Sequence, residues 1–142
     1  MSEEPLSIAD YPLAEKRPEI VRGKRGKGLD EITLDALLEE RVTLEDLRIT
    51  GAALCQQAEI ARAAGRDTLA ANFERGAELV DVPQATIMRM YELLRPGRAE
   101  SQDELLAVAK ELRDQYGAKG MAEFVEEAAT VYERRGLFKK RF

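Results

Sequence analysis

The chain has 142 residues, of which 44% are hydrophobic and 35% are charged, and its formal net charge is −5. This length suits one domain, no stretch approaches the ~20 apolar residues of a membrane span, and no basic segment followed by an apolar core marks a secretory signal. One cysteine excludes an internal disulfide, and the absence of histidine removes the commonest general base and metal ligand, so composition predicts a small cytoplasmic helical protein with little chemistry of its own.

Residues 1–49 are predicted to form an irregular N-terminal arm. Prolines and glycines disfavour long regular elements there: Pro5, Pro12, Pro18, Gly23, Gly26 and Gly28. Thr33 and Thr43, ten residues apart, are each predicted to cap a short helical turn. We expect the leucines of these turns to bury against the rest of the chain: Leu34, Leu37, Leu38, Leu44 and Leu47. Because so apolar an arm is poorly placed to fold alone, it is predicted to dock on a partner.

Residues 50–142 are predicted to form a helical body. An apolar stripe at helical spacing opens it: Leu54, Ala58, Ala61, Gly65, Leu69, Phe73, Gly76 and Val80. The unbroken phase of this stripe favours one long helix from near Thr50 to before Pro83. The alternative, that Gly65 ends one helix and the next residues cap another, stays open. Gly76 is expected to allow the close approach of another backbone.

Three further helices complete the body. One follows Pro83 and stops at Pro96, and the second is predicted to start with a capping box of Ser101 and Glu104 and to close at Gly117. The third ends at Gly136, and the basic tail at 137–142 is expected to be loose. Nothing in the sequence predicts paired strands, so the fold class is all-α.

The strongest local charge signal is basic and lies between residues 16 and 27. Its members are Lys16, Arg17, Arg22, Lys24, Arg25 and Lys27. The glycines at 23, 26 and 28 resemble a phosphate loop only superficially, since Gly28 replaces the hydroxyl residue and no buried strand precedes them. Nucleic-acid binding through this loop is an alternative function, opposed by the negative net charge. The favoured interpretation is a solvated loop, or one docked on an acidic partner surface.

No other cluster predicts an active site. The carboxylate pairs Glu39-Glu40 and Glu126-Glu127 are adjacent on helices, so their side chains diverge. Cys55 has no histidine to activate it and is interpreted as a packed or partly exposed thiol. The sequence therefore predicts no catalytic, cofactor-binding or metal-binding residue in this chain.

Ordered blocks between about residues 10 and 135 resemble the small subunit of coenzyme-dependent diol and glycerol dehydratases. Among them are Tyr11-Pro12-Leu13-Ala14, Ala64-Gly65-Arg66-Asp67-Thr68-Leu69-Ala70-Ala71-Asn72-Phe73-Glu74-Arg75, and Phe124-Val125-Glu126-Glu127-Ala128-Ala129-Thr130-Val131-Tyr132. The chain departs from similar proteins at Gly51, where proline is frequent, and at Gly76, where alanine is usual. The basic glycine-rich loop at 22–28 has no family role to carry over.

This resemblance implies an open three-helix up-and-down bundle with additional short helices and an irregular N-terminal part. It also implies a dimer of heterotrimers of large, medium and small subunits, with adenosylcobalamin between the large and medium subunits and none bound by this chain. Such an enzyme converts propane-1,2-diol or glycerol to an aldehyde and water by a radical mechanism, while the small subunit supports the large one. Packaging in a bacterial microcompartment is a further hypothesis. The rival function is a freestanding helical adaptor.

Overall fold

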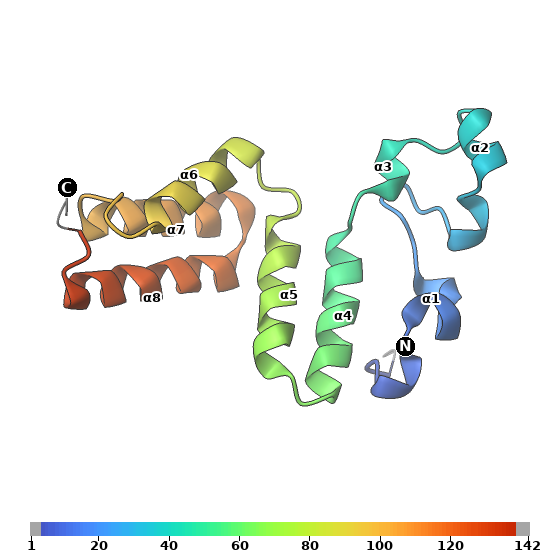
Figure 1. Ribbon diagram of the computed structural model, residues 1–142, viewed down its shortest axis with the longest axis horizontal. Helices are drawn as coiled ribbons and strands as arrows, with labels where there is room; N and C mark the ends of the chain where they lie inside the picture. The colour runs from blue at the N-terminus through green and yellow to red at the C-terminus, as the bar shows by residue number, and fades with distance from the viewer. Residues whose placement is uncertain (1–3, 139–142) are drawn as a thin grey trace. The chain divides into compact units, whose positions relative to one another are not determined.

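The computed structural model describes residues 4–138 and shows helices joined by loops (Figure 1). Within these residues an isolated antiparallel bridge joins Arg22 to Gly28 and no strand forms, so the predicted all-α class is confirmed. The chain divides into two compact units, residues 1–80 and 81–142. The first long helix therefore begins inside the first unit, and position 50 does not separate compact units. Across the described helices, none has both the length and the apolar character needed to cross a bilayer.

Within residues 4–49, the N-terminal arm contains six short helices, in keeping with its prolines and glycines. They are η1 (Ile8–Asp10), α1 (Leu13–Lys16), η2 (Pro18–Ile20), η3 (Leu29–Glu31), α2 (Leu34–Leu38) and α3 (Leu44–Leu47). The two predicted threonine-started turns are α2 and α3. Thr33 Oγ1 accepts the Ala36 N–H at 3.1 Å, as a cap should, and Asp46 Oδ2 accepts the Thr43 N–H at 2.9 Å.

The favoured single helix from near Thr50 to before Pro83 is wrong, and the alternative that Gly65 ends one helix is confirmed. The structure has two helices, α4 (Gly51–Ala63) and α5 (Asp67–Leu79), which pack against each other as a hairpin (Figure 1). Gly65 lies between them with φ +72°, a left-handed conformation that favours glycine and ends α4. The apolar phase survives the turn because each helix directs its small residues toward the other. Ala58, Ala61 and Ala70 form that buried core, with Phe73 packed on it.

Gly76 does not mark a close approach of two backbones, which corrects a second expectation. A Cβ built on Gly76 would lie 3.7 Å from Leu54 Cδ1, an ordinary van der Waals contact with a side chain. Glycine in a helix interior costs about 1 kcal/mol relative to alanine because it loses more backbone freedom on folding. Gly76 therefore weakens α5 without a steric reason.

The second unit contains α6 (Gln84–Leu94), α7 (Gln102–Tyr116) and α8 (Lys119–Arg135). Helices α7 and α8 form a hairpin, and α6 contacts α7. Gly117 closes α7 with φ +63°, as predicted. The core of this unit is made of large and small apolar residues from the facing helix sides: Leu105, Val108, Ala109, Leu112, Met121, Ala122, Val125 and Ala129.

Two details of this unit differ from expectation. The Ser101 side chain makes no cap hydrogen bond, and Glu104 Oε2 accepts the Glu100 N–H instead, at 2.6 Å. The start of the tail is tied down, since the Gly97 N–H donates to the Leu137 carbonyl at 3.2 Å and the Leu137 N–H donates to the Tyr132 carbonyl at 2.9 Å. The rest of the predicted loose tail, 139–142, lies outside the described residues.

Candidate subunit interface

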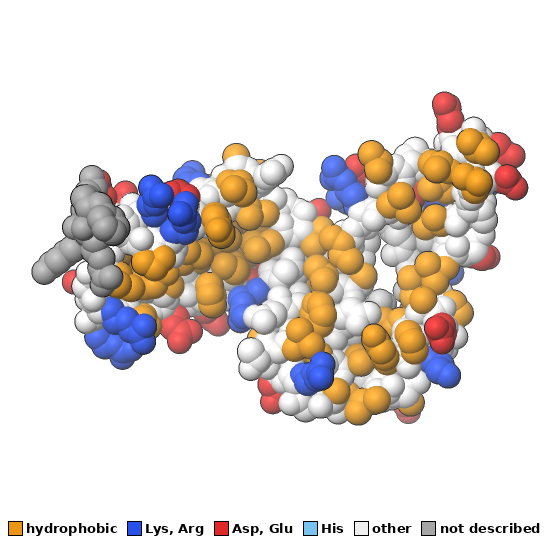
Figure 2. Space-filling model, in the orientation of Figure 1, with side chains coloured by type: hydrophobic (Ala, Val, Ile, Leu, Met, Phe, Trp, Pro, Cys, Tyr) orange, Lys and Arg blue, Asp and Glu red, His pale blue; other side chains and the backbone are white. Residues whose placement is uncertain are grey.

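Helices α2 and α3 direct their leucines to the outside of the arm. We call Leu34, Leu37, Leu38, Leu44 and Leu47 the arm surface. Leu34 is 71% exposed, Leu38 73% and Leu44 80%, and the other two are also at least half exposed, so the expected burial against the rest of the chain is wrong. Figure 2 shows hydrophobic side chains gathered over α2 and α3. Full burial of one such side chain contributes about 1.5–3 kcal/mol, which the arm leaves unused.

The leucines face outward because small or polar residues occupy the inner side of these helices. Ala36 is buried, and its carbonyl accepts the N–H groups of Arg41 at 2.9 Å and Val42 at 3.1 Å. These bonds fold the chain after α2 back over Ala36, which is almost fully buried. Val42, also buried, completes the inner side. Leu34, Leu37 and Leu38, spaced three and four residues apart, consequently share the outer face of α2.

Asp46 attaches α3 to the basic loop. Only 2% of Asp46 is exposed, and its carboxylate accepts hydrogen bonds from Arg25 Nε at 2.8 Å and from the Thr43 N–H at 2.9 Å. The Arg25 guanidinium also donates to the Arg41 carbonyl at 3.1 Å. The Arg25 hydrogen bond holds the pKa of Asp46 below its ordinary value, against an opposing effect of burial, and the Thr43 N–H lowers it further. A charged, bonded Asp46 thus fixes the position of α3.

The glycines of the basic loop allow it to lie against α3. A Cβ on Gly23 would come within 2.5 Å of the Asp46 carbonyl oxygen, so no larger residue fits without a backbone shift. The loop turns tightly, with the Gly23 N–H donating to the Lys27 carbonyl and the Gly26 N–H donating to the Gly23 carbonyl, both at 2.9 Å. This loop, interpreted from the sequence as solvated or docked on an acidic partner surface, packs on α3 and supports the arm surface.

The arginines of the predicted basic patch are bonded to acidic residues of the arm. Arg17 contacts Asp10 and Glu19, at 3.0 Å and 2.6 Å. These hydrogen bonds raise the pKa of Arg17, with the Glu19 bond the larger cause. Arg22 lies 3.9 Å from Glu31, and Arg25 is bonded to Asp46. The arginines of the patch are therefore paired with carboxylates, which weakens the nucleic-acid alternative because phosphate binding needs uncompensated positive charge.

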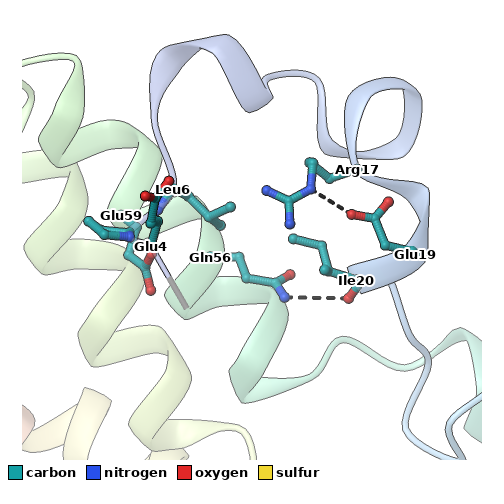
Figure 3. Close-up of a pocket in the computed structure, with 8 residues that line it drawn as sticks. Glu4, Leu6, Arg17, Glu19, Ile20, Gln56 and Glu59 are labelled. Atoms are coloured by element: carbon teal, nitrogen blue, oxygen red, sulfur yellow. Dashed lines mark hydrogen bonds and ion pairs between the residues drawn. The ribbon is translucent and has the colours of Figure 1, made fainter. Parts of the chain in front are cut away.

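The beginning of the described chain is anchored on α4. The Leu6 N–H donates to Glu59 Oε2 at 3.0 Å, and Gln56 Nε2 donates to the Ile20 carbonyl at 3.4 Å. Figure 3 shows the hollow between these contacts, into which Leu6 and Ile20 project and where the Arg17–Glu19 pair lies. The sequence gives no signal for Gln56 or Glu59 as anchors. Glu59, Glu19 and the Arg17 guanidinium at this hollow all bond to groups of the arm, so the hollow marks where the arm packs on α4.

The other residues considered from the sequence lie apart. Glu126 is bonded to Arg113, Nη2 to Oε2 at 3.0 Å, and that bond lowers the pKa of Glu126. Glu127 is exposed elsewhere on α8, and Cys55 is exposed on α4. Within residues 4–138, no three acidic or cysteine side chains are placed to hold a metal ion together.

An apolar surface held rigidly outward by buried polar contacts is typical of a subunit that completes its packing on another chain. Residues 6–139 match the family model described as "Dehydratase small subunit". The chain therefore belongs to the dehydratase small-subunit family. It is 50% identical over 132 residues to the propanediol dehydratase small subunit of Citrobacter freundii, which covers 93% of this chain and 76% of that protein. The protein of the same name from Salmonella typhimurium is 49% identical over the same shares.

Proposed function

We propose that this chain is the small subunit of a dehydratase that converts a 1,2-diol, propane-1,2-diol or glycerol, to an aldehyde and water. The supporting observation is the arm surface, whose leucines are exposed while Ala36 and Asp46 occupy the inside. Two relatives at about half identity are named propanediol dehydratase small subunit, which favours a diol as the substrate. The chain's role in this proposal is to support the large subunit.

The proposed complex is a dimer of heterotrimers, each with a large, a medium and this small subunit. Residues 1–49 act as the docking arm, and residues 50–142 form the helical body. Adenosylcobalamin lies between the large and medium subunits and supplies the radical that starts the reaction, so no residue of this chain is assigned to hold it. The complex works in the cytoplasm, and packaging inside a bacterial microcompartment is part of the proposal.

Co-expression tests this function. The chain, carrying a C-terminal tag, is produced together with candidate large and medium subunits and purified through the tag. We expect all three chains to co-purify with adenosylcobalamin-dependent dehydratase activity toward a diol. Recovery of the tagged chain alone, with full activity remaining in the other two subunits, would contradict the proposal. A freestanding adaptor would behave in that way.

A further inference from the structure

The acidic charge of the chain is concentrated around the arm surface. Residues 29–49 contain seven acidic side chains and two basic ones, an excess equal to the net charge of −5 of the whole chain. The rest of the sequence is therefore balanced. Figure 2 shows acidic side chains at the margin of the hydrophobic group over α2. The leucines are thus bordered by negative charge.

Part of this charge is already neutralised within the chain. Arg25 is bonded to Asp46, and Arg22 lies 3.9 Å from Glu31. The only two arginines within 29–49 are similarly engaged, Arg41 with Glu39 at 2.6 Å and Arg48 with Glu45 at 3.2 Å. No cation within 29–49 is therefore left to balance further acidic residues.

Three acidic residues of the segment remain: Asp30 in η3, Asp35 in α2, and Glu40 just after α2. All three are exposed, and none forms an ion pair within residues 4–138. Asp35 lies on α2, between Leu34 and Leu37, and Glu40 follows the end of that helix. Asp35 and Glu40 place uncompensated carboxylates next to the exposed leucines of α2, Leu34 and Leu38.

The geometry points to a partner whose docking face is apolar at its centre and bordered by lysine or arginine side chains, located on the catalytic subunits of the same dehydratase. This inference rests on the proposed function. Apolar centres supply the affinity of such interfaces, and charges at the rim direct association and select the partner. A second copy of this chain is disfavoured as the occupant because two surfaces with the same acidic border repel each other.

The test is the salt dependence of association. The full chain is immobilised, and catalytic subunits expressed without it are passed over it at 50 mM and 500 mM NaCl. Complementary rim charges attract over about one Debye length, roughly 8 Å at physiological ionic strength, so we expect the association rate constant to fall about tenfold at the higher salt. The double variant Asp35→Asn/Glu40→Gln should lower the rate constant at 50 mM about threefold and flatten the salt dependence.

The control is Glu15→Gln/Glu127→Gln, which removes two exposed carboxylates elsewhere on the chain. It changes the net charge equally and should leave the rate constant close to that of the unaltered chain. Circular dichroism and the unfolding midpoint establish that both double variants fold. A rate constant that is independent of salt or rises with it, or equal effects of the two variants, would overturn the inference while leaving the proposed function intact. Binding at neither salt concentration contradicts both, and self-association of the chain would identify a second copy as the occupant.

Discussion

The arm and the α7–α8 hairpin place leucine on opposite sides of their helices. In α7, Leu105 and Leu112 are fully buried. In α2 and α3 the leucines are exposed, and the buried positions belong to Ala36 and Asp46. The hairpin is stabilised by its own apolar core, whereas the arm is stabilised by hydrogen bonds and ion pairs around a small interior. The apolar surface of the arm stays exposed for contact with another protein. Substitutions of leucine should therefore affect folding in the hairpin and association in the arm.

The largest expected effect lies in the hairpin core. Leu112→Ala leaves a cavity among buried side chains and should lower the free energy of unfolding by about 3–5 kcal/mol. Leu106→Ala is the matched control on the same helix. Because Leu106 is partly exposed, its replacement should lower the free energy of unfolding much less. Chemical denaturation followed by circular dichroism measures both. Equal losses would mean that α7 does not bury one side selectively.

On the arm, the same kind of change should affect assembly and spare folding. Leu34→Ser/Leu38→Ser removes two exposed leucines and should weaken binding to the catalytic subunits about a hundredfold, because each side chain loses most of its burial energy in the complex. The free energy of unfolding of the free chain should stay within about 0.5 kcal/mol. Pull-down titration and denaturation measure the two quantities. A stability loss without a binding loss would place these leucines in the chain's own core.

Gly23 tests the contact that positions α3. Gly23→Ala places a Cβ about 2.5 Å from the Asp46 carbonyl oxygen. Because the backbone must shift to relieve this contact, the free energy of unfolding should fall by about 1–3 kcal/mol. Limited proteolysis of the arm measures the effect, since a displaced loop exposes cleavage sites. Gly28→Ala is a graded comparison, because its Cβ would meet side-chain atoms of Asp30 and Arg22, which can move more easily. If Gly23→Ala leaves protection unchanged, the loop does not pack on α3 as described.

The ordering of α3 should depend on pH through Asp46. Its pKa in the folded chain is lowered, so its contribution to stability is fully present above the unfolded carboxyl pKa of about 3.9 and is lost as the pH falls through the folded pKa. Proteolytic protection of the arm by an acid-active protease should therefore decline below about pH 4. Asp46→Asn should reduce protection at neutral pH and flatten this decline. If protection of the arm declines with pH equally steeply in Asp46→Asn, the pH dependence arises from other carboxyl groups.

The smallest expected effect is a gain. Gly76→Ala adds a methyl group at ordinary contact distance from Leu54 and should raise the free energy of unfolding by about 0.5–1 kcal/mol. Gly117→Ala is the opposite case, because φ is +63° at this position and alanine is strained there. The melting temperatures of the two variants should move in opposite directions. A loss of stability in Gly76→Ala would restore the expected close approach at this position.

The sequence predicted those helix ends that are set by a residue at the end itself. Proline and glycine positions indicated the irregular arm, Thr33 indicated a cap, and Gly117 indicated the end of α7, each through the backbone at that site. The Gly65 turn was misjudged because two helices that face each other keep the same apolar phase as one continuous helix. Asp46 stands three residues after Thr43, the spacing of a capping box, which is a signal for the hydrogen bond to the backbone but not for the bond to Arg25.

The sequence by itself determined the all-α class, the short elements of the arm and the family, because composition, caps and ordered blocks of residues are properties of the chain. Only the tertiary structure decided which side of α2 and α3 faces outward. Leucines at helical spacing form the same sequence pattern whether they are buried in the chain's own core or exposed for contact with another subunit. The inner side of α3 is set by contacts with residues far away in the sequence. Arg25 bonds to the Asp46 carboxylate, and Gly23 lies against the Asp46 carbonyl.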